Sequence, residues 1–414
     1  MTARKPDLVL LSGRFPHGEA VLGGELAAIA PRFRRVFVIP SHPGRPGAET
    51  TELPENAAVA DLGWQRGWSR AQKQEALRTP QALRILARTL RRPSNWRAYA
   101  GGARAYLDLL AENLLKARSL EAWVGENGLR EALFYDFWFE NSTLALAELR
   151  RRGAIRCAVA RAHRFDAFDF AEAGLRRVPF REFKAAHLDA IFPIAEDSAR
   201  YMRERVGRDA GKVRLARLGV PFPPSYPERP DDPPLVVSCS SLIPRKQVHL
   251  IPAALAACER PLRWVHFGEG PERSRVEAAA ASLPAAVSWE LPGRVENEVV
   301  RGFYAEHGVS AFLSLSLSEG VPVSMMEAQS FGVPIVSLAV GGVPEIVVPG
   351  TGILLPAEAG STEVAVALDE AIEPGSFDRA EVRAAFAARY DAAANYRDFA
   401  DALVEVWSEN VAGG

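Results

Sequence analysis

Two glutamates that stand eight positions apart are the side chains of this sequence best placed to do chemistry. Glu319 follows an apolar, strand-like run over residues 309–317, and Glu327 lies early in a helix whose start we expect at Gly320. Backbone N–H groups at a helix start hold phosphates, and ionised carboxylates accept hydrogen bonds from pairs of sugar hydroxyls. Together these groups favour a nucleotide sugar as the ligand. The residues that open the helix belong to the same candidate donor site: Gly320, Val321 and Val323.

Both glutamates also have a purely structural interpretation. Ser324 stands three residues before Glu327, which is the spacing of a capping box, where the glutamate only satisfies a backbone donor. Glu319, taken alone, is equally consistent with a solvated loop residue. The ligand interpretation therefore depends on the elements that surround the pair.

Alternating strands and helices position these residues. We expect strands at residues 235–239, 263–267, 287–290, 309–315, 334–340 and 352–355, with helices at 247–258, 271–283, 296–307 and 322–331. Short apolar strands that alternate with helices imply a parallel sheet covered on both faces. Such a sheet binds ligands outside the carboxyl ends of its strands. Glu319, Gly268 and Lys246 each follow an expected strand.

The first half of the chain repeats this rhythm. Strands are expected at residues 8–11, 36–40, 132–137, 156–160, 190–194 and 213–218. Residues 221–234 then include seven prolines in fourteen positions, and proline continues neither a helix nor a central strand. We therefore expect an N-terminal domain over residues 1–220, a linker over 221–234, a C-terminal domain over 235–395 and a final helix over 396–414.

A basic helical insertion is expected at residues 64–122, between the second and third strands. From Arg66 to Arg118 it has twelve arginines and lysines against three acidic residues. Aromatic residues are interleaved with them: Trp64, Trp68, Trp96 and Tyr99. Such a run is either a solvated helix face or a surface for anionic lipid at the inner face of a membrane.

Composition narrows the class of protein. The chain has 414 residues, 48% hydrophobic and 24% charged, which is enough for two or three domains. A net charge of −1 argues against binding of nucleic acid by the whole molecule. Three scattered cysteines argue against a disulfide framework and a zinc site. We see no signal peptide and no membrane-spanning run, so we expect a cytoplasmic protein.

The glutamate pair and the glycines after it carry a family resemblance. Glu319-x7-Glu327, followed by Gly332-Val333-Pro334 and Gly341-Gly342-Val343-Pro344-Glu345, resembles the retaining glycosyltransferases of family 4 (group 1). The resemblance covers nearly the whole chain. It implies an α/β GT-B fold: two Rossmann-like domains, with parallel sheets facing across a cleft and the final helix packing back on the first domain. In that family the first glutamate lies by the donor sugar and the second holds the nucleotide ribose.

The segment after the first strand of the C-terminal domain resembles the family's diphosphate site. Lys246 matches a lysine that binds the donor diphosphate, and two cations there would offset its charge. Ser241, however, stands where the family has an arginine. Arg245 is a candidate substitute, although a solvated helix start explains it equally well.

Two more segments resemble donor-site loops. Gly268 and Gly270 match a tight turn near the nucleotide, although a Gly-x-Gly also serves as an ordinary connection from strand to helix. Arg294 lies in a segment whose backbone, in the family, meets the base.

The N-terminal domain also has two matching segments. His163 and Asp166 resemble a His-x-x-Asp segment beside the transferred sugar, where a neutral imidazole donates to or accepts from a hydroxyl. Gly18 resembles a loop over the diphosphate and acceptor, and Gly23-Gly24 is the alternative for that role.

The resemblance implies transfer of a sugar from a nucleotide-diphosphate donor to a hydroxyl of a glycan or lipid-linked acceptor, with retained configuration, in bacterial surface-polysaccharide synthesis. We expect no metal and no cofactor besides the nucleotide sugar, with His163, Glu319 and Lys246 as catalytic residues. The alternatives are a nucleotide-sugar epimerase of the same fold and a catalytically silent nucleotide-sugar-binding protein.

Overall fold

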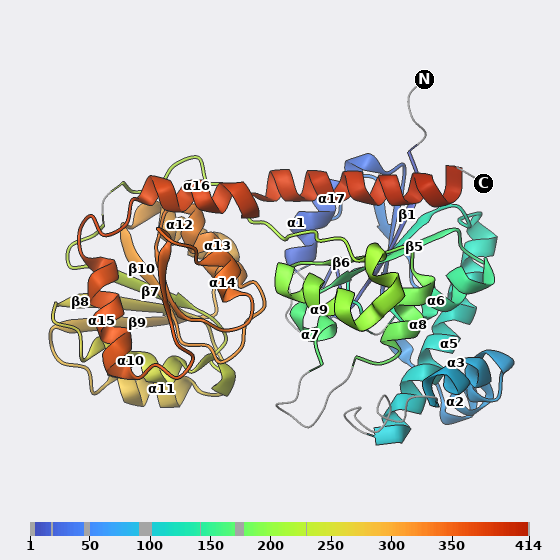
Figure 1. Cartoon of the computed structure of the whole chain (residues 1–414), viewed down its shortest axis with the longest axis horizontal. Coiled ribbons are helices and arrows are strands. Elements are labelled where there is room, and N and C mark those ends of the chain that lie inside the picture. The colour runs from blue at the N-terminus through green and yellow to red at the C-terminus, as the bar shows by residue number, and fades with distance from the viewer. Residues whose placement is uncertain are drawn as a thin grey trace. The chain divides into compact units, whose positions relative to one another are not determined.

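The computed structural model describes residues 5–17, 20–44, 50–90, 102–140, 142–169, 178–228 and 230–412, and the chain forms two units. Unit 1 comprises Met1–Arg217 and Tyr396–Gly414, and unit 2 comprises Leu218–Asn395. Helix α17 (Ala392–Trp407) begins in unit 2 and continues into unit 1. Figure 1 shows that each unit has its own sheet with helices on both faces.

The sheet of unit 1 has six parallel strands in the order β3-β2-β1-β4-β5-β6. Their bounds are β1 (Leu8–Ser12), β2 (Val36–Pro40), β3 (Ala57–Val59), β4 (Leu133–Asp136), β5 (Cys157–Ala162) and β6 (Ala190–Pro193). This is the strand order of a Rossmann fold. The strand expected at residues 213–218 does not form as a regular strand. Val213 makes an isolated bridge to Ile191, and Arg214 N and Ala216 N each donate to a backbone oxygen of β6 at 2.9 Å.

Two hydrophobic layers cover this sheet because alternate strand residues point to opposite faces. Val9 and Leu11 of β1 belong to a core with α5 (Gly102–Asn127), α6 (Thr143–Arg152) and α9 (Glu196–Val206). Leu8 and Leu10 belong to the opposite core, which includes α1 (Ala20–Ile29) and the part of α17 in unit 1. Among the described residues of unit 1, the other α-helices are α2 (Arg70–Leu77), α3 (Pro80–Leu90), α7 (Arg164–Ala167) and α8 (Arg181–His187).

The sheet of unit 2 also has six parallel strands, in the order β12-β11-β10-β7-β8-β9. The strands are β7 (Leu235–Cys239), β8 (Leu262–Phe267), β9 (Val287–Gly293), β10 (Val309–Ser314), β11 (Ile335–Leu338) and β12 (Gly352–Leu355). The helices are α10 (Ile251–Leu255), α11 (Arg273–Ala280), α12 (Asn297–Glu306), α13 (Val323–Ser330), α14 (Val343–Ile346), α15 (Ser361–Ile372) and α16 (Arg379–Tyr390). Read from β9, the order repeats that of unit 1, which confirms the predicted pair of Rossmann-like sheets.

Strand order fixes where ligands are expected. The direction of winding reverses between β1 and β4 in unit 1, and between β7 and β10 in unit 2. Ligands of open α/β sheets bind outside the carboxyl ends of the strands at such reversal points. The loops that follow β7 and β10 are therefore the first place to look in unit 2.

The proline-rich segment belongs to unit 2 and packs against α16. The Arg383 guanidinium of α16 lies 4.3 Å from the ring centroid of Phe222 and 4.1 Å from that of Tyr226. It also donates to the carbonyl oxygens of Pro223, at 3.1 Å, and Ser330, at 2.7 Å. Ser330 ends α13, so one side chain ties the segment after the unit boundary to the helix that carries Glu327.

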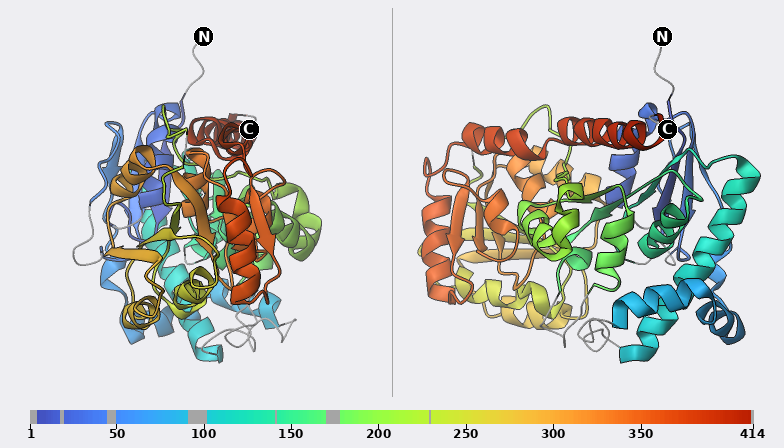
Figure 2. Two further views of the ribbon diagram at one scale, coloured as in Figure 1. Left: turned by 90° about the vertical axis from the view of Figure 1, so that its left-hand side faces the viewer. Right: turned by 45° about the vertical axis from the view of Figure 1, so that its right-hand side comes forward.

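Part of the basic insertion is buried. Trp64 is 3% exposed and its Nε1 donates to Ser119 Oγ at 2.8 Å. Lys116 is 4% exposed. Helices α2 and α3 lie against the N-terminal half of α5, as Figure 2 shows. Among the described residues, the arginines of the insertion that remain exposed are Arg66, Arg70, Arg78, Arg84, Arg88, Arg104 and Arg118.

Candidate active site

The loops after β7 and β10 bring two predicted residues into contact. Lys246 Nζ forms an ion pair with Glu319 Oε1, and their side chains are only 16% and 11% exposed. Leu317 N donates to Arg245 O at 2.9 Å, so the two loops are also joined through their backbones. Glu319 occupies one of the three ammonium N–H donors of Lys246 and leaves two for an anionic ligand.

The predicted glycine turn allows two loops to approach closely. Gly268 has φ +149°, and a Cβ at this position would lie 1.8 Å from Ser240 O. A Cβ on Gly270 would lie 2.4 Å from Leu242 O. Leu242 N donates to Glu269 O at 3.0 Å. The glycines after β8 therefore make room for the loop that ends in Lys246.

A buried hydrogen-bond chain holds the start of that loop. Trp264 Nε1 lies 2.9 Å from Ser238 Oγ, which lies 2.8 Å from His266 Nδ1, and His266 Nε2 lies 3.1 Å from Ser240 O. Ser240 O can only accept, so Nε2–H donates to it. In a neutral ring Nδ1 is then the acceptor, and the Ser238 hydroxyl donates to Nδ1 while it accepts from the indole N–H. Burial lowers the pKa of His266 to about 4, which keeps the ring neutral. The hydrogen-bond chain was not predicted from the sequence, because only strand pairing brings Ser238 beside His266.

Glu327 lies inside the unit, with 5% of its surface exposed, and Oε1 accepts from Asn297 Nδ2 at 2.6 Å. Pro322 is the N-cap of α13 and no side chain caps that helix, so the capping-box interpretation is wrong. Ser324 lies within the first turn instead of at the cap. Burial raises the pKa of Glu327, and the bond from Asn297 and the charge of Arg301 oppose this.

The other predicted donor residues line the same edge of the sheet. Val321 is buried, at 6% exposure, while Gly320 and Val323 are partly exposed. A Cβ on Gly342 would lie 2.3 Å from Gly320 O, so the loops after β10 and β11 abut. The side chains of Ser241, Arg245 and Arg294 are exposed, on the loops after β7 and β9.

In unit 1, His163 directly follows β5, is the N-cap of α7 and is 9% exposed. Its Nε2 lies 3.1 Å from Phe137 O, and its ring lies 4.8 Å from the Phe137 ring and 4.3 Å from the Trp138 ring, centroid to centroid. Burial, with the charge of Arg161, lowers the pKa of His163 to about 3. The ring is therefore neutral, with Nε2–H as donor and Nδ1 as acceptor.

The carboxylate of Asp166 accepts hydrogen bonds from backbone N–H groups. It accepts from His163 N at 2.6 Å and from Phe139 N at 2.7 Å, and Lys184 Nζ donates to Phe139 O at 2.7 Å. Burial raises the pKa of Asp166 to about 7 and lowers that of Lys184 to about 7. Asp166 therefore shapes the loop after β4.

Two more buried ionisable groups hold the loop after β4, and neither role was predicted from the sequence. Asp136 Oδ2 accepts from Thr143 Oγ1 at 2.8 Å, and Lys116 Nζ donates to Ser142 Oγ at 3.0 Å. Burial raises the pKa of Asp136 to about 7 and lowers that of Lys116 to about 8. The position of Asp136 at the end of an apolar strand could have indicated its role. Lys116 gave no such indication, because it stands in a run of basic residues whose described members are mostly exposed. The predicted Gly18 lies outside the described residues.

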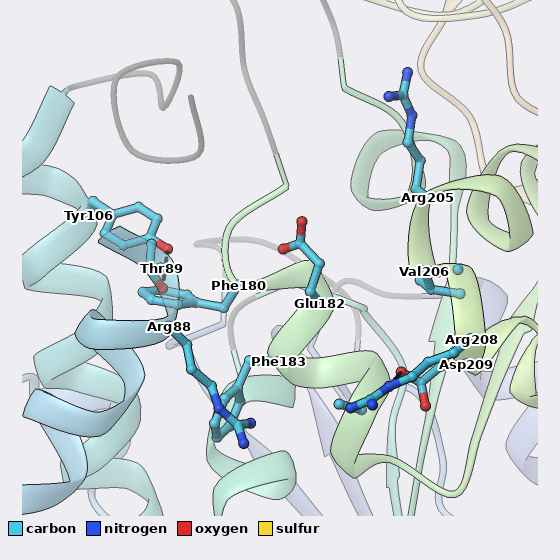
Figure 3. Close-up of a pocket in the computed structure, with 12 residues that line it drawn as sticks. Arg88, Thr89, Tyr106, Phe180, Glu182, Phe183, Arg205, Val206, Arg208 and Asp209 are labelled. Atoms are coloured by element: carbon cyan, nitrogen blue, oxygen red, sulfur yellow. Dashed lines mark hydrogen bonds and ion pairs between the residues drawn. The ribbon is translucent and has the colours of Figure 1, made fainter. Parts of the chain in front are cut away.

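A cavity of about 610 Å³ in unit 1, shown in Figure 3, contains none of the predicted site residues. Arg88, Arg205 and Arg208 line it together with the aromatic rings of Tyr106, Phe180 and Phe183. Acidic side chains, Glu182 and Asp209, line it as well. The candidate donor site is therefore the edge of the unit 2 sheet, where Lys246, Glu319 and Glu327 gather.

Part of the chain is similar to known glycosyltransferases. Residues 225–388 match the family model "Glycosyl transferases group 1". WcaL of Escherichia coli (strain K12), named for colanic acid biosynthesis, is 27% identical over 172 residues, which are 38% of this chain and 41% of that protein. WcaL of Salmonella typhimurium is 27% identical over 182 residues, which are 41% of this chain and 44% of that protein. The matches thus span less than half the length of these relatives.

Solved structures share the fold over nearly the whole chain. The lipopolysaccharide outer core galactosyltransferase WaaB, in its apo form, has a TM-score of 0.67 at 14% identity, covering 96% of this chain and 99% of that one. Anabaena HepE in complex with UDP and glucose has a TM-score of 0.61 at 15% identity, covering 97% and 100%.

The two Rossmann-like sheets and these neighbours define a GT-B fold. Residues 225–388, within unit 2, match the model of group 1 glycosyltransferases, in agreement with the resemblance. Family 4, the narrower assignment, stays a prediction. Within the described ranges, no helix is long and apolar enough to cross a membrane.

Proposed function

We propose that this protein transfers a sugar from a nucleotide-diphosphate donor to a hydroxyl acceptor and retains the configuration at the anomeric carbon. The observation that carries the proposal is the gathering of Lys246, Glu319 and buried Glu327 where winding reverses in a group 1 domain. A structural neighbour crystallised with UDP and glucose supports a nucleotide-sugar donor.

In the proposed reaction, the bond between the anomeric carbon and the diphosphate oxygen breaks as the acceptor oxygen forms its new bond. The acceptor proton leaves with the diphosphate. Lys246 and the N–H groups in the first turn of α13 stabilise the charge that grows on the leaving group. Glu319 orients Lys246 and lies by the donor sugar, and Glu327 accepts the ribose hydroxyls. His163, neutral with Nδ1 as acceptor, remains our candidate in unit 1 for a sugar hydroxyl.

A donor panel tests this function against its alternatives. We expect nucleotide release from one nucleotide sugar only when a hydroxyl acceptor is present. An altered sugar on an intact nucleotide would instead establish an epimerase of the same fold. Binding without turnover would establish a silent nucleotide-sugar-binding protein, an alternative to which Ser241, in place of a second cation, gives some support.

We propose that the reaction needs no metal ion, because Lys246 and backbone amides supply the positive charge on the diphosphate. Among the described residues there is no cluster of three histidine, cysteine or acidic side chains that could hold one. Initial rates are therefore expected to be unchanged after dialysis against a chelator. Loss of activity that Mg²⁺ or Mn²⁺ restores would refute this part of the proposal.

We further propose a glycan or lipid-linked acceptor of bacterial surface-polysaccharide synthesis, reached at an anionic membrane surface. WcaL, named for colanic acid biosynthesis, supports the pathway class. The exposed arginines of the insertion, and Leu83 of α3 with 61% of its surface exposed, support the membrane contact. Each lysine or arginine close to an anionic lipid surface contributes about 1 kcal/mol to the free energy of membrane binding.

Vesicle sedimentation tests the membrane contact. Binding to vesicles with anionic lipid is expected at low salt and is expected to weaken as salt rises. The double variant Arg70→Glu with Arg78→Glu should weaken it further, while Arg275→Glu on α11, outside the insertion, should not. Sedimentation that does not depend on lipid charge would contradict the proposal.

A further inference from the structure

Asn297 is the first residue of α12 and reaches across to the carboxylate on α13. Its Nδ2 donates to Glu327 Oε1 at 2.6 Å. Asn297 itself is exposed, whereas Glu327 is 5% exposed. The bond therefore joins a residue at the solvent side of the site to one inside it.

A carboxylate held at one oxygen presents the other in a fixed direction. An ionised carboxylate offers about four acceptor positions on its two oxygens, and the Asn297 amide occupies one of them. The amide can only donate through Nδ2, so it favours the ionised carboxylate as its partner.

We propose that Asn297 is a positioning residue for donor binding: by holding Glu327 Oε1, it orients the second oxygen toward the paired hydroxyls of the donor ribose. This inference rests on the proposed function, because it assumes that Glu327 binds the nucleotide. It adds a residue of α12 that the spacing of the two glutamates does not reveal.

The surroundings of Glu327 make this amide important. Burial raises the pKa of Glu327, Asn297 and then Arg301 lower it, and Glu298 raises it again. Burial also raises the pKa of Cys239, to about 12, and that of Tyr304 to well above its ordinary value, so both are neutral at neutral pH. The Tyr304 hydroxyl has no hydrogen-bond partner among the described residues. Asn297 thus supplies the side-chain hydrogen bond that most favours ionised Glu327.

The sign of the pH effect follows. A protonated Glu327 loses acceptor capacity, so nucleotide affinity is lost as pH falls through the pKa of this group. Without the Asn297 donor that pKa rises further, and the loss begins at higher pH. Removing the negative charge of Glu298 acts in the opposite direction.

The experiment measures UDP affinity by calorimetry between pH 5 and 8 for the wild type, Asn297→Asp and Glu298→Gln. Asn297→Asp keeps the size but replaces the donor by a carboxylate, which cannot donate when ionised and repels the Glu327 charge. We therefore expect about tenfold weaker UDP binding at neutral pH and a loss of affinity that begins at higher pH. In Glu298→Gln the loss of UDP affinity should begin at lower pH than in the wild type. In turnover, Asn297→Asp should raise KM for the donor more than it lowers kcat. Asn297→Ser, whose hydroxyl can still donate, should recover part of the affinity.

A titration of the Glu327 carboxyl by NMR in the ligand-free protein separates this inference from the proposed function. Unchanged UDP affinity and an unchanged Glu327 pKa in Asn297→Asp would overturn the inference. Failure of the wild type to bind any nucleotide of the donor panel would overturn the proposed function, whatever the NMR titration shows.

Discussion

Lys246→Met is expected to lower kcat for sugar transfer by about 10²–10³-fold, the cost of removing one preorganised charge at a leaving group. The reason is the position of Lys246 at the reversal point of the unit 2 sheet, with its ammonium held by Glu319. The thioether keeps most of the side-chain volume but cannot balance the charge of a departing diphosphate. Lys246→Arg keeps the charge and should retain more activity than Lys246→Met.

Steady-state kinetics with the donor found in the panel measures this effect. The control is Arg275→Met, because Arg275 is an exposed cation of α11 whose side chain is 59% exposed. Wild-type kcat and donor KM in the Lys246→Met enzyme would show that Lys246 does not stabilise the leaving group.

Gly268→Ala is expected to destabilise unit 2 by about 4 kcal/mol or more, the range of the most severe single substitutions. A Cβ at Gly268 would lie 1.8 Å from a backbone carbonyl oxygen, Ser240 O, and the residue has φ +149°. Neither the left-handed backbone nor the carbonyl can adjust alone, since His266 also holds Ser240 O. The loop that leads to Lys246 must therefore move, and transfer activity should fall together with stability.

Thermal and denaturant unfolding measure the loss, with Gly302→Ala as the matched control. Gly302 lies within α12, and a Cβ there would meet no atom within 4 Å. Replacing a helical glycine by alanine should stabilise the protein by about 0.5–1 kcal/mol. Equal unfolding midpoints for Gly268→Ala and the wild type would show that the two loops do not pack as described.

The sequence predicted the fold best where strands are buried on both faces. The strands of unit 2 appear as apolar runs bounded by glycine, proline or charge, and β7, which is buried, has the predicted bounds. The half-buried edge strand β12 also has them. The short edge strand β3 was not predicted, because Ala57–Val59 is partly or fully exposed and has no buried apolar run. Residues 213–218 have a strand-like pattern, and their contact with β6 is limited to one bridge at Val213 and single hydrogen bonds from Arg214 N and Ala216 N. The Arg214 side chain pairs with Glu405 and Glu409 of the C-terminal segment.

The site was predictable only in part, for a similar reason. Spacing placed Glu319 and Lys246 at strand ends, and the parallel sheet then brought them together. The spacing did not show that Asn297 of α12 contacts α13, so Asn297 was missed. His266 of β8 was also missed, because its hydrogen-bond partners belong to β7 and the loop after it. The local sequence also suggested a wrong cap: Ser324 and Glu327 have capping-box spacing, but the N-cap of α13 is Pro322. Trp64 and Lys116 resembled surface residues because the helices that cover them are distant in sequence.

A crystal structure with bound nucleotide sugar tests the proposed donor site most directly. We expect the ribose hydroxyls on Glu327, the diphosphate against Lys246 and the start of α13, and the sugar beside Glu319. A nucleotide bound elsewhere, for example in the arginine-lined cavity of unit 1, with the Lys246–Glu319 ion pair left untouched, would contradict this assignment.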